Sequence, residues 1–317
     1  MNWQPRLGYA CLSTDCEPRK ERLGVNVRYE GVCDRVLQIV QSLNEVIGVG
    51  LAGSQALGLA DKYSDLDLQV FVTAIPALDR RREAYAGVEG TGMGPLDHSV
   101  AEQFGNPPTS ARFVVDWLTV DGLKCDVLWL PMGELMGILA RLPGEWDQRE
   151  SAAVLAEVVQ PLYDPRGAVA EFKRACPAYP ESRARDKVAA LLGHAHFFLC
   201  DWAVLGKCLF RQDVLAYALA ERQMVETLVD ALYAANQVWQ NDRRRLREQV
   251  GRFCVLPDRF MERIESMLLR QGRHKTLAAC HEELLSLFRD ISAGASQAHP
   301  DWRLPSRWRA KDWENGR

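Results

Sequence analysis

Residues 47–72 read IGVGLAGSQALGLADKYSDLDLQVFV, and the rest of the chain is organised around this stretch. A short apolar run ends at Gly53-Ser54, and after a spacer of ten residues come Asp65 and Asp67, separated by a single leucine. Because side chains alternate along a strand, the two aspartates lie side by side on one face. The stretch therefore predicts a strand, a Gly-Ser turn, a short helix and a second strand that carries paired carboxylates.

This pairing of carboxylates with a glycine turn indicates a site for a metal ion and a phosphate. Two neighbouring carboxylates raise each other's pKa unless a cation lies between them. Magnesium takes one or two carboxylates together with substrate phosphates, which makes Asp65 and Asp67 the predicted metal ligands. A glycine between a strand and a helix lets backbone N–H groups approach a phosphate, which makes Gly53 and Ser54 the predicted phosphate-binding residues. The alternative is a capped helix beside a solvated acidic strand edge.

The same residues resemble the signature of the nucleotidyltransferase superfamily, which includes polymerase beta, the CCA-adding enzymes and the aminoglycoside nucleotidyltransferases. The signature residues are AGS at 52–54 and DLDL at 65–68. The longer form GSxxxGxxxxxSDxDL, with Gly58 and Ser64, looks like the minimal and antibiotic-modifying members. The resemblance covers about residues 47–165. It implies an α/β nucleotidyltransferase domain, with a mixed sheet flanked by helices.

A third carboxylate is expected on the hairpin predicted for residues 112–130, RFVVDWLTVDGLKCDVLWL. Two β-rich runs flank Asp121-Gly122, which is a strong two-residue turn signal. An aspartate in so apolar a strand is costly unless it is paired or bound to a cation. In the superfamily a third metal ligand comes from a strand next to the Asp-x-Asp strand. The resemblance therefore implies Asp126 as this ligand, with Asp116 as the alternative.

The chain is long enough for two domains, each with its own core. A catalytic domain is predicted over residues 1–176, in which Asp164 belongs to a turn or caps a helix. Within it, the Gly- and Pro-rich connection 87–108 is expected to line or cover the substrate. Long amphipathic helices without strand signals predict an all-α domain over residues 181–293, which resembles the helical substrate- and nucleotide-binding domain of small-molecule nucleotidyltransferases. The tryptophan-rich tail 294–317 is expected to pack on the body.

The helical domain is expected to contribute a cation and a general base. A triphosphate needs at least one cation beyond magnesium. Lys187 is taken as this phosphate-binding residue, with Lys207 and Arg211 as alternatives. The base would be a carboxylate near the acceptor hydroxyl. Glu226 is favoured over Glu221 for this role, and the third metal ligand itself is the remaining alternative.

Composition narrows the class of protein and its partners. The chain has 47% hydrophobic and 26% charged residues with a net charge of −3, which is ordinary for a soluble protein and disfavours nucleic acid as a partner. No apolar run reaches the ~18 residues of a membrane span, and no signal peptide is predicted. Nine scattered cysteines match no zinc spacing, so reduced thiols in a cytoplasmic protein are expected.

The function that the resemblance implies is a magnesium-dependent transferase of the EC 2.7.7 type. It would move a nucleoside monophosphate from a nucleoside triphosphate, with ATP favoured, to a hydroxyl of a small acceptor, releasing pyrophosphate. Two magnesium ions would be held by Asp65, Asp67 and Asp126. The alternatives are a toxin–antitoxin nucleotidyltransferase that acts on protein or tRNA, and a non-catalytic nucleotide-binding partner. The acceptor, the choice of nucleotide and a homodimeric state are left open.

Overall fold

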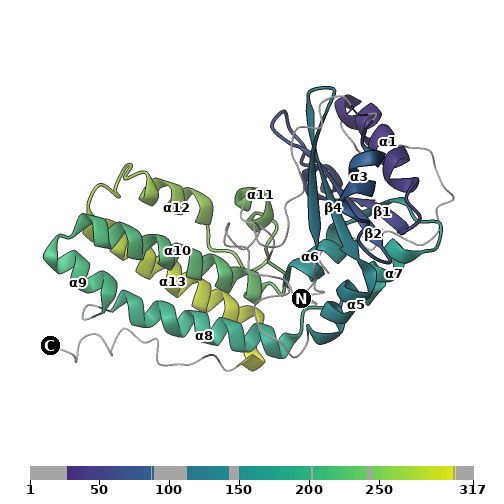
Figure 1. Ribbon diagram of the computed structural model, residues 1–317. Coiled ribbons are helices and arrows are strands. Elements are labelled where there is room, and N and C mark those ends of the chain that lie inside the picture. Colours follow the sequence, from purple (N-terminus) through teal and green to yellow (C-terminus); the bar gives the residue numbers. More distant parts are fainter. Residues whose placement is uncertain are drawn as a thin grey trace. The chain divides into compact units, whose positions relative to one another are not determined.

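A computed structural model describes residues 27–86, 88, 113–142, 150–200, 203–240, 245–302 and 304 (Figure 1). These residues divide into two compact units. The first comprises the described residues up to Glu134 together with Val158–Lys173, and the second comprises Leu135–Glu157 and the described residues from Arg174 onward. Nearly all of the connection predicted at 87–108 lies outside the described residues.

The first unit is built on one five-stranded mixed sheet. Its strands lie in the order β3-β4-β2-β1-β5, in which only β2 and β4 run parallel. The strands are β1 (Val46–Leu51), β2 (Leu66–Val72), β3 (Val114–Val120), β4 (Leu123–Pro131) and β5 (Gln160–Tyr163). The mixed sheet and its flanking helices confirm the fold class predicted for this part of the chain.

The central strand β2 is covered on both faces. Helix α1 (Val27–Gln41) contacts β1 and β2, while Phe71 packs against Phe172 with ring centroids 5.3 Å apart. Six of the seven residues of β2 are buried, and Asp67 is half-buried. Two further helices of the unit are α2 (Gly53–Ala56) and α3 (Leu78–Ala84). Asp67, near the beginning of the strand, is therefore the residue of β2 whose side chain solvent can partly reach.

The β3–β4 hairpin turns at the dipeptide predicted from the sequence. Asp121 and Gly122 both have positive φ, 51° and 73°, as a type I′ turn requires. Glycine adopts this conformation at little cost, and aspartate is among the few other residues that tolerate it. The turn fixes a register in which Trp117 lies opposite Asp126 and Asp116 lies opposite Val127.

Asp164 caps the helix that follows β5, which confirms its predicted role. The backbone N–H groups of Val169 and Ala170 donate to its two carboxylate oxygens, and each donor–acceptor distance is 3.0 Å. These groups lie in the first turn of α7 (Ala168–Ala175), where backbone donors have no partner within the helix.

The second unit contains no strand among its described residues. Helices α8, α10 and α13 lie side by side in Figure 1 and contact one another. The helices from this part of the chain are α5 (Met132–Arg141), which begins in the first unit, α6 (Glu150–Val158), α8 (Glu181–Leu199), α9 (Val204–Arg211), α10 (Val214–Ala235), α11 (Leu246–Val250), α12 (Phe260–Leu268), α13 (Leu277–Ala298) and the 3₁₀ helix Pro300–Trp302. This confirms the expectation of a helical region after the sheet.

The largest difference between the predicted domains and the two units is the placement of one segment. Leu135–Glu157 falls within the predicted domain 1–176, yet it groups with the helices of the second unit. The domain boundaries at 176 and 181 therefore stay a prediction. Of the predicted tail 294–317, Trp302 is buried and its indole Nε1 donates to Glu181 over 3.0 Å. The two remaining tryptophans of the tail lie outside the described residues.

One segment, Glu181–Arg211, is long and apolar enough to cross a membrane by length and composition alone. It contains α8 and α9, and α8 buries Val188, Leu192 and Leu199 among the helices of its unit. Core helices of globular proteins have the same composition, so the segment is weak support for a membrane span.

Candidate metal centre

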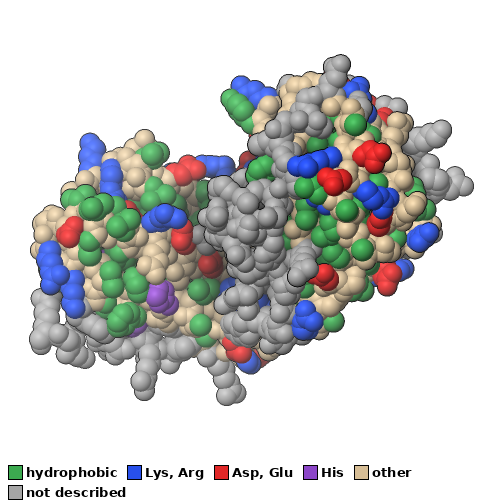
Figure 2. Space-filling view, viewed as in Figure 1, with side chains coloured by type: hydrophobic (Ala, Val, Ile, Leu, Met, Phe, Trp, Pro, Cys, Tyr) green, Lys and Arg blue, Asp and Glu red, His purple; other side chains and the backbone are tan. Residues whose placement is uncertain are grey.

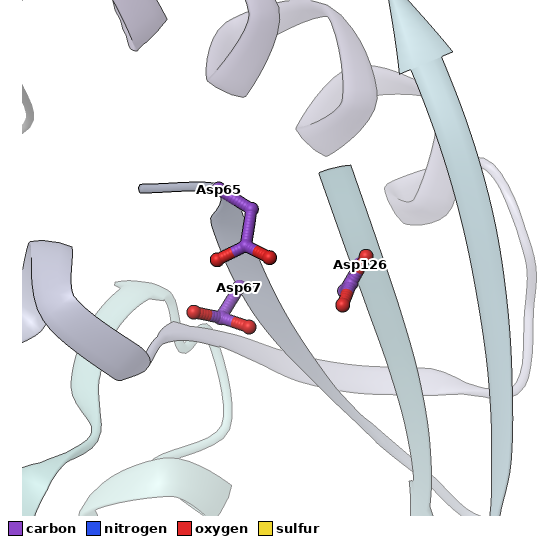
Figure 3. A group of neighbouring side chains, drawn as sticks. All are labelled: Asp65, Asp67 and Asp126. Atoms are coloured by element: carbon purple, nitrogen blue, oxygen red, sulfur yellow. The ribbon is translucent and has the colours of Figure 1, made fainter. Parts of the chain in front are cut away.

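Three carboxylates meet where the parallel strands β2 and β4 begin. The strand register aligns Asp67 with Asp126, and Asp65 directly precedes β2 on the same face as Asp67. One oxygen from each of the three lies within 4.8 Å of the others. Figure 3 shows Asp65 and Asp67 one above the other, with Asp126 on the neighbouring strand. The structure thus brings together the three residues predicted as metal ligands.

The chemistry of this group suits a divalent cation. Carboxylates so close together repel one another, and a cation between them relieves the repulsion. All three side chains are half-buried, so solvent and ions can reach them. Oxygen donors with room for water are the ligands that magnesium and similar hard cations prefer.

Gly53 lies against one of these carboxylates. A β-carbon at Gly53 would stand 1.8 Å from Oδ2 of Asp67, and the backbone of Gly53 has φ of +60°. The N–H of Ala52 donates to the backbone oxygen of Asp67 over 2.9 Å, which fixes the turn beside the strand. Ser54 follows in α2 and is half-exposed. Glycine is therefore required here by the Asp67 carboxylate itself, a reason that the motif alone did not give.

Ser64 organises the turn that leads into the Asp-x-Asp strand. Its hydroxyl accepts the N–H of Asp61 over 2.8 Å and donates to the Asp61 carboxylate over 3.1 Å. The hydroxyl of Tyr29 donates to the backbone oxygen of Ser64. These bonds fix the backbone immediately before Asp65.

Asp116, the alternative third ligand, is an anchor inside the domain. Residues opposite each other on paired strands share a face, so Asp116, opposite Val127, points away from Asp126. Its buried Oδ2 accepts bonds from three side chains at 2.6–3.2 Å, which are Arg81, Tyr85 and Trp129. Burial and the Asp116 carboxylate raise the pKa of Tyr85 far above its usual range.

The ammonium of Lys124 lies between two of these carboxylates, and the sequence analysis did not predict Lys124 as a residue of the site. Its Nζ lies 3.0 Å from Oδ2 of Asp65 and 3.3 Å from the carboxylate of Asp126. Partial burial alone would lower the pKa of Lys124, but the hydrogen bond to Asp65 and the attraction of both aspartates raise it overall. The available signal was its spacing, because Lys124 precedes Asp126 by two positions and shares its face of β4.

The residues predicted in the helical region lie in the second unit. Lys187 is a half-buried residue of α8. Glu226 on α10 accepts a hydrogen bond from Arg222 over 3.1 Å. Its alternative, Glu221, is buried and holds Arg270 through two bonds of 2.7 and 2.8 Å. Lys207 and Arg211 lie on α9. The roles of all of these residues towards a nucleotide stay predictions.

Residues 33–89 match the family model of the nucleotidyltransferase domain. The matched residues include the Gly-Ser turn and the Asp-x-Asp strand, whereas Asp126 lies beyond them. None of the curated proteins compared with the chain matches it. Among solved structures, a nucleotidyltransferase-like protein from Exiguobacterium sibiricum is 11% identical with a TM-score of 0.39, over 84% of this chain and 77% of that one. This similarity is too low to establish a shared fold.

Proposed function

We propose that the chain is a catalytically active, metal-dependent member of the nucleotidyltransferase superfamily, whose domain model matches residues 33–89. It would transfer a nucleoside monophosphate from a nucleoside triphosphate, with ATP favoured, to a hydroxyl group, with release of pyrophosphate. The observation that supports this proposal most is the meeting of Asp65, Asp67 and Asp126 beside the Gly-Ser turn.

Each of these residues has a role in the proposed reaction. Asp65 and Asp67 would hold a magnesium ion against the nucleotide phosphates, and with Asp126 they would hold a second. When bound, the ions would neutralise phosphate charge and lower the pKa of the acceptor hydroxyl. The first backbone N–H groups of α2, at Gly53 and Ser54, have no partner within the helix and would donate to the phosphates.

We propose a small hydroxylated molecule, such as an aminoglycoside or lincosamide, as the acceptor, in a cytoplasmic enzyme. On the face shown in Figure 2, the basic and acidic side chains of the described residues are interspersed within each unit. The net charge of the whole chain is −3. Binding of a nucleic acid backbone depends on gathered positive charge, so these features favour a small acceptor over tRNA.

The test is a transfer assay with the full-length protein, magnesium and each of the four nucleoside triphosphates labelled at the α-phosphate. A panel of hydroxylated acceptors is added, and mass spectrometry detects an acceptor that has gained a nucleoside monophosphate. We expect transfer by the wild type and none by Asp65→Asn or Asp67→Asn, because an amide keeps the shape of the carboxylate without its charge. Both variants should melt at or near the wild-type temperature.

Two outcomes would contradict the proposal. Wild-type turnover by either variant would remove the carboxylates from catalysis. Nucleotide binding by the wild type without transfer to any acceptor, protein or tRNA would instead indicate a non-catalytic nucleotide-binding protein.

A further inference from the structure

We propose that Lys124 is a built-in counter-cation of the carboxylate cluster, which a divalent ion must displace to bind Asp65 and Asp126 together. The inference rests on the proposed function, since it concerns the same metal centre. It adds a residue that weakens ion binding in the absence of nucleotide.

The first argument is position. The ammonium of Lys124 is within hydrogen-bond distance of a carboxylate from each strand, 3.0 Å from Asp65 and 3.3 Å from Asp126. It therefore lies where a cation shared by these two carboxylates would lie. A magnesium ion binds carboxylate oxygens at about 2.0–2.1 Å, so the ammonium and an ion on the same two oxygens exclude each other.

The second argument is that Lys124 can leave. Its side chain is 52% exposed, against 23% for Asp65 and 22% for Asp126. The lysine stem is flexible and its ammonium is strongly hydrated, so it can turn into solvent while β4 stays in place. Each ion pair of such exposure contributes little to stability, so displacing Lys124 from its two carboxylates costs little free energy.

The third argument is charge. Three carboxylates and one ammonium leave an excess of two negative charges. This excess still attracts a divalent ion, so the lysine reduces the affinity of the cluster without abolishing it. When no ion is bound, the ammonium of Lys124 also reduces the repulsion among the three carboxylates.

The experiment measures binding of Mn²⁺ alone to the full-length protein, by electron paramagnetic resonance of free Mn²⁺ and by calorimetry at fixed salt. Lys124→Met removes the charge and keeps the length of the side chain. We expect its Kd for Mn²⁺ to fall by about 3- to 30-fold, the range expected for two partly exposed ion pairs. Lys275→Met, the same change at an exposed lysine of the second unit, should leave the Kd unchanged.

Further variants connect the signal to the cluster. Asp67→Asn should weaken Mn²⁺ binding. This result would show that the bound Mn²⁺ detected in the experiment lies at the carboxylate cluster. Lys124→Gln should behave like Lys124→Met, and Lys124→Arg, which keeps the charge, should retain the wild-type affinity. Circular dichroism establishes that each variant is folded. Without metal, Lys124→Met should melt at a lower temperature than the wild type. Added Mn²⁺ should raise the Tm of Lys124→Met by more than it raises the Tm of the wild type.

An unchanged or increased Kd in folded Lys124→Met and Lys124→Gln overturns the displacement role while leaving the metal centre intact. Absence of Mn²⁺ binding in both the wild type and the two lysine variants overturns the metal centre of the proposed function together with this inference.

Discussion

At the scale of single residues, Gly53 and Asp67 share one small volume. The carboxylate of Asp67 fills the space that a side chain at position 53 would need, because a β-carbon there would stand only 1.8 Å from Oδ2. A substitution at Gly53 must therefore move a proposed metal ligand, whatever else it does to the phosphates.

Gly53→Ala should thus impair metal binding, and Gly58→Ala provides a matched control. Both glycines have positive φ, +60° and +66°, but a β-carbon at Gly58 would meet nothing within 4 Å. Both changes should cost about 1–3 kcal/mol of stability from backbone strain. Only Gly53→Ala should lose transfer activity and at least about tenfold in Mn²⁺ affinity, equal to about 1.4 kcal/mol. Equal kinetic defects in the two variants would contradict a role for the Asp67 contact.

The sequence predicted the residues of the motif but missed Lys124. Gly53, Asp65 and Asp67 lie within the stretch that matches the family model of the nucleotidyltransferase domain. Lys124 reads as an ordinary surface lysine, because its contact with Asp65 depends on the pairing of β2 with β4. This contact joins two strands that are far apart in the chain, so the spacing of residues within either strand does not reveal it.

At the scale of elements, the hairpin carries two aspartates with opposite surroundings. Asp126 faces the open cluster, whereas Asp116 faces the interior and ties β3 to α3 through Arg81 and Tyr85. Burial of an anion is tolerated there because a cation and neutral donors surround it.

These surroundings predict opposite results for the two alanine variants. Asp116→Ala leaves buried Arg81 without its carboxylate, and should cost about 3–5 kcal/mol of stability while the folded protein stays active. Asp126→Ala should abolish transfer with unchanged or higher thermal stability, because a like charge beside Asp65 and Asp67 is removed. Thermal melts and transfer assays run at a temperature where both variants are folded check this. A destabilised, active Asp126→Ala would remove Asp126 from the proposed metal ligands.

The hairpin was predictable because its turn and its alternation are local signals. Sequence reasoning favoured Asp126 over Asp116 only through the family resemblance, since both aspartates stand among apolar residues. What separates them is the face on which each lies, and that follows from the register of β3 on β4.

At the scale of the whole molecule, the chain crosses between its two units more than once. It leaves the first unit after Glu134, returns at Val158 and leaves again after Lys173. Two hydrogen bonds hold the intervening segment to the rest of the second unit. Arg183 donates to the backbone oxygen of Leu142 at 3.1 Å, and the thiol of Cys176 donates to the backbone oxygen of Ala153 at 3.5 Å.

A fragment of residues 1–176 should therefore be less stable than the sequence-predicted domain boundary suggests. It would keep the segment 135–157 but lose the later helices with which that segment groups, including the Arg183 side chain that donates to the backbone oxygen of Leu142. We expect a lower Tm than for the full chain and binding of a hydrophobic dye. Cooperative melting at the full-chain Tm without dye binding would support the boundary near 176 instead.

The class of each half was predictable, because periods of 2 and 3.6 residues distinguish strands from helices. The allocation of 135–157 was not, since a helical pattern shows that one face is buried but does not identify the neighbour that covers it. The sequence likewise predicted the helices that carry Lys187 and Glu226, but not the groups that their side chains contact.

The pairing of β2 with β4 also has a consequence for the order of folding. Asp67 and Asp126 are distant in the sequence, so the carboxylate cluster does not exist until this non-local pairing has formed. Strand β4 brings Lys124 and Asp126 together, so the compensating positive charge arrives in the same step as the third negative one. An ion that recognises the cluster is then a ligand of the completed sheet, and it will lengthen the lifetime of the folded chain rather than hasten its formation.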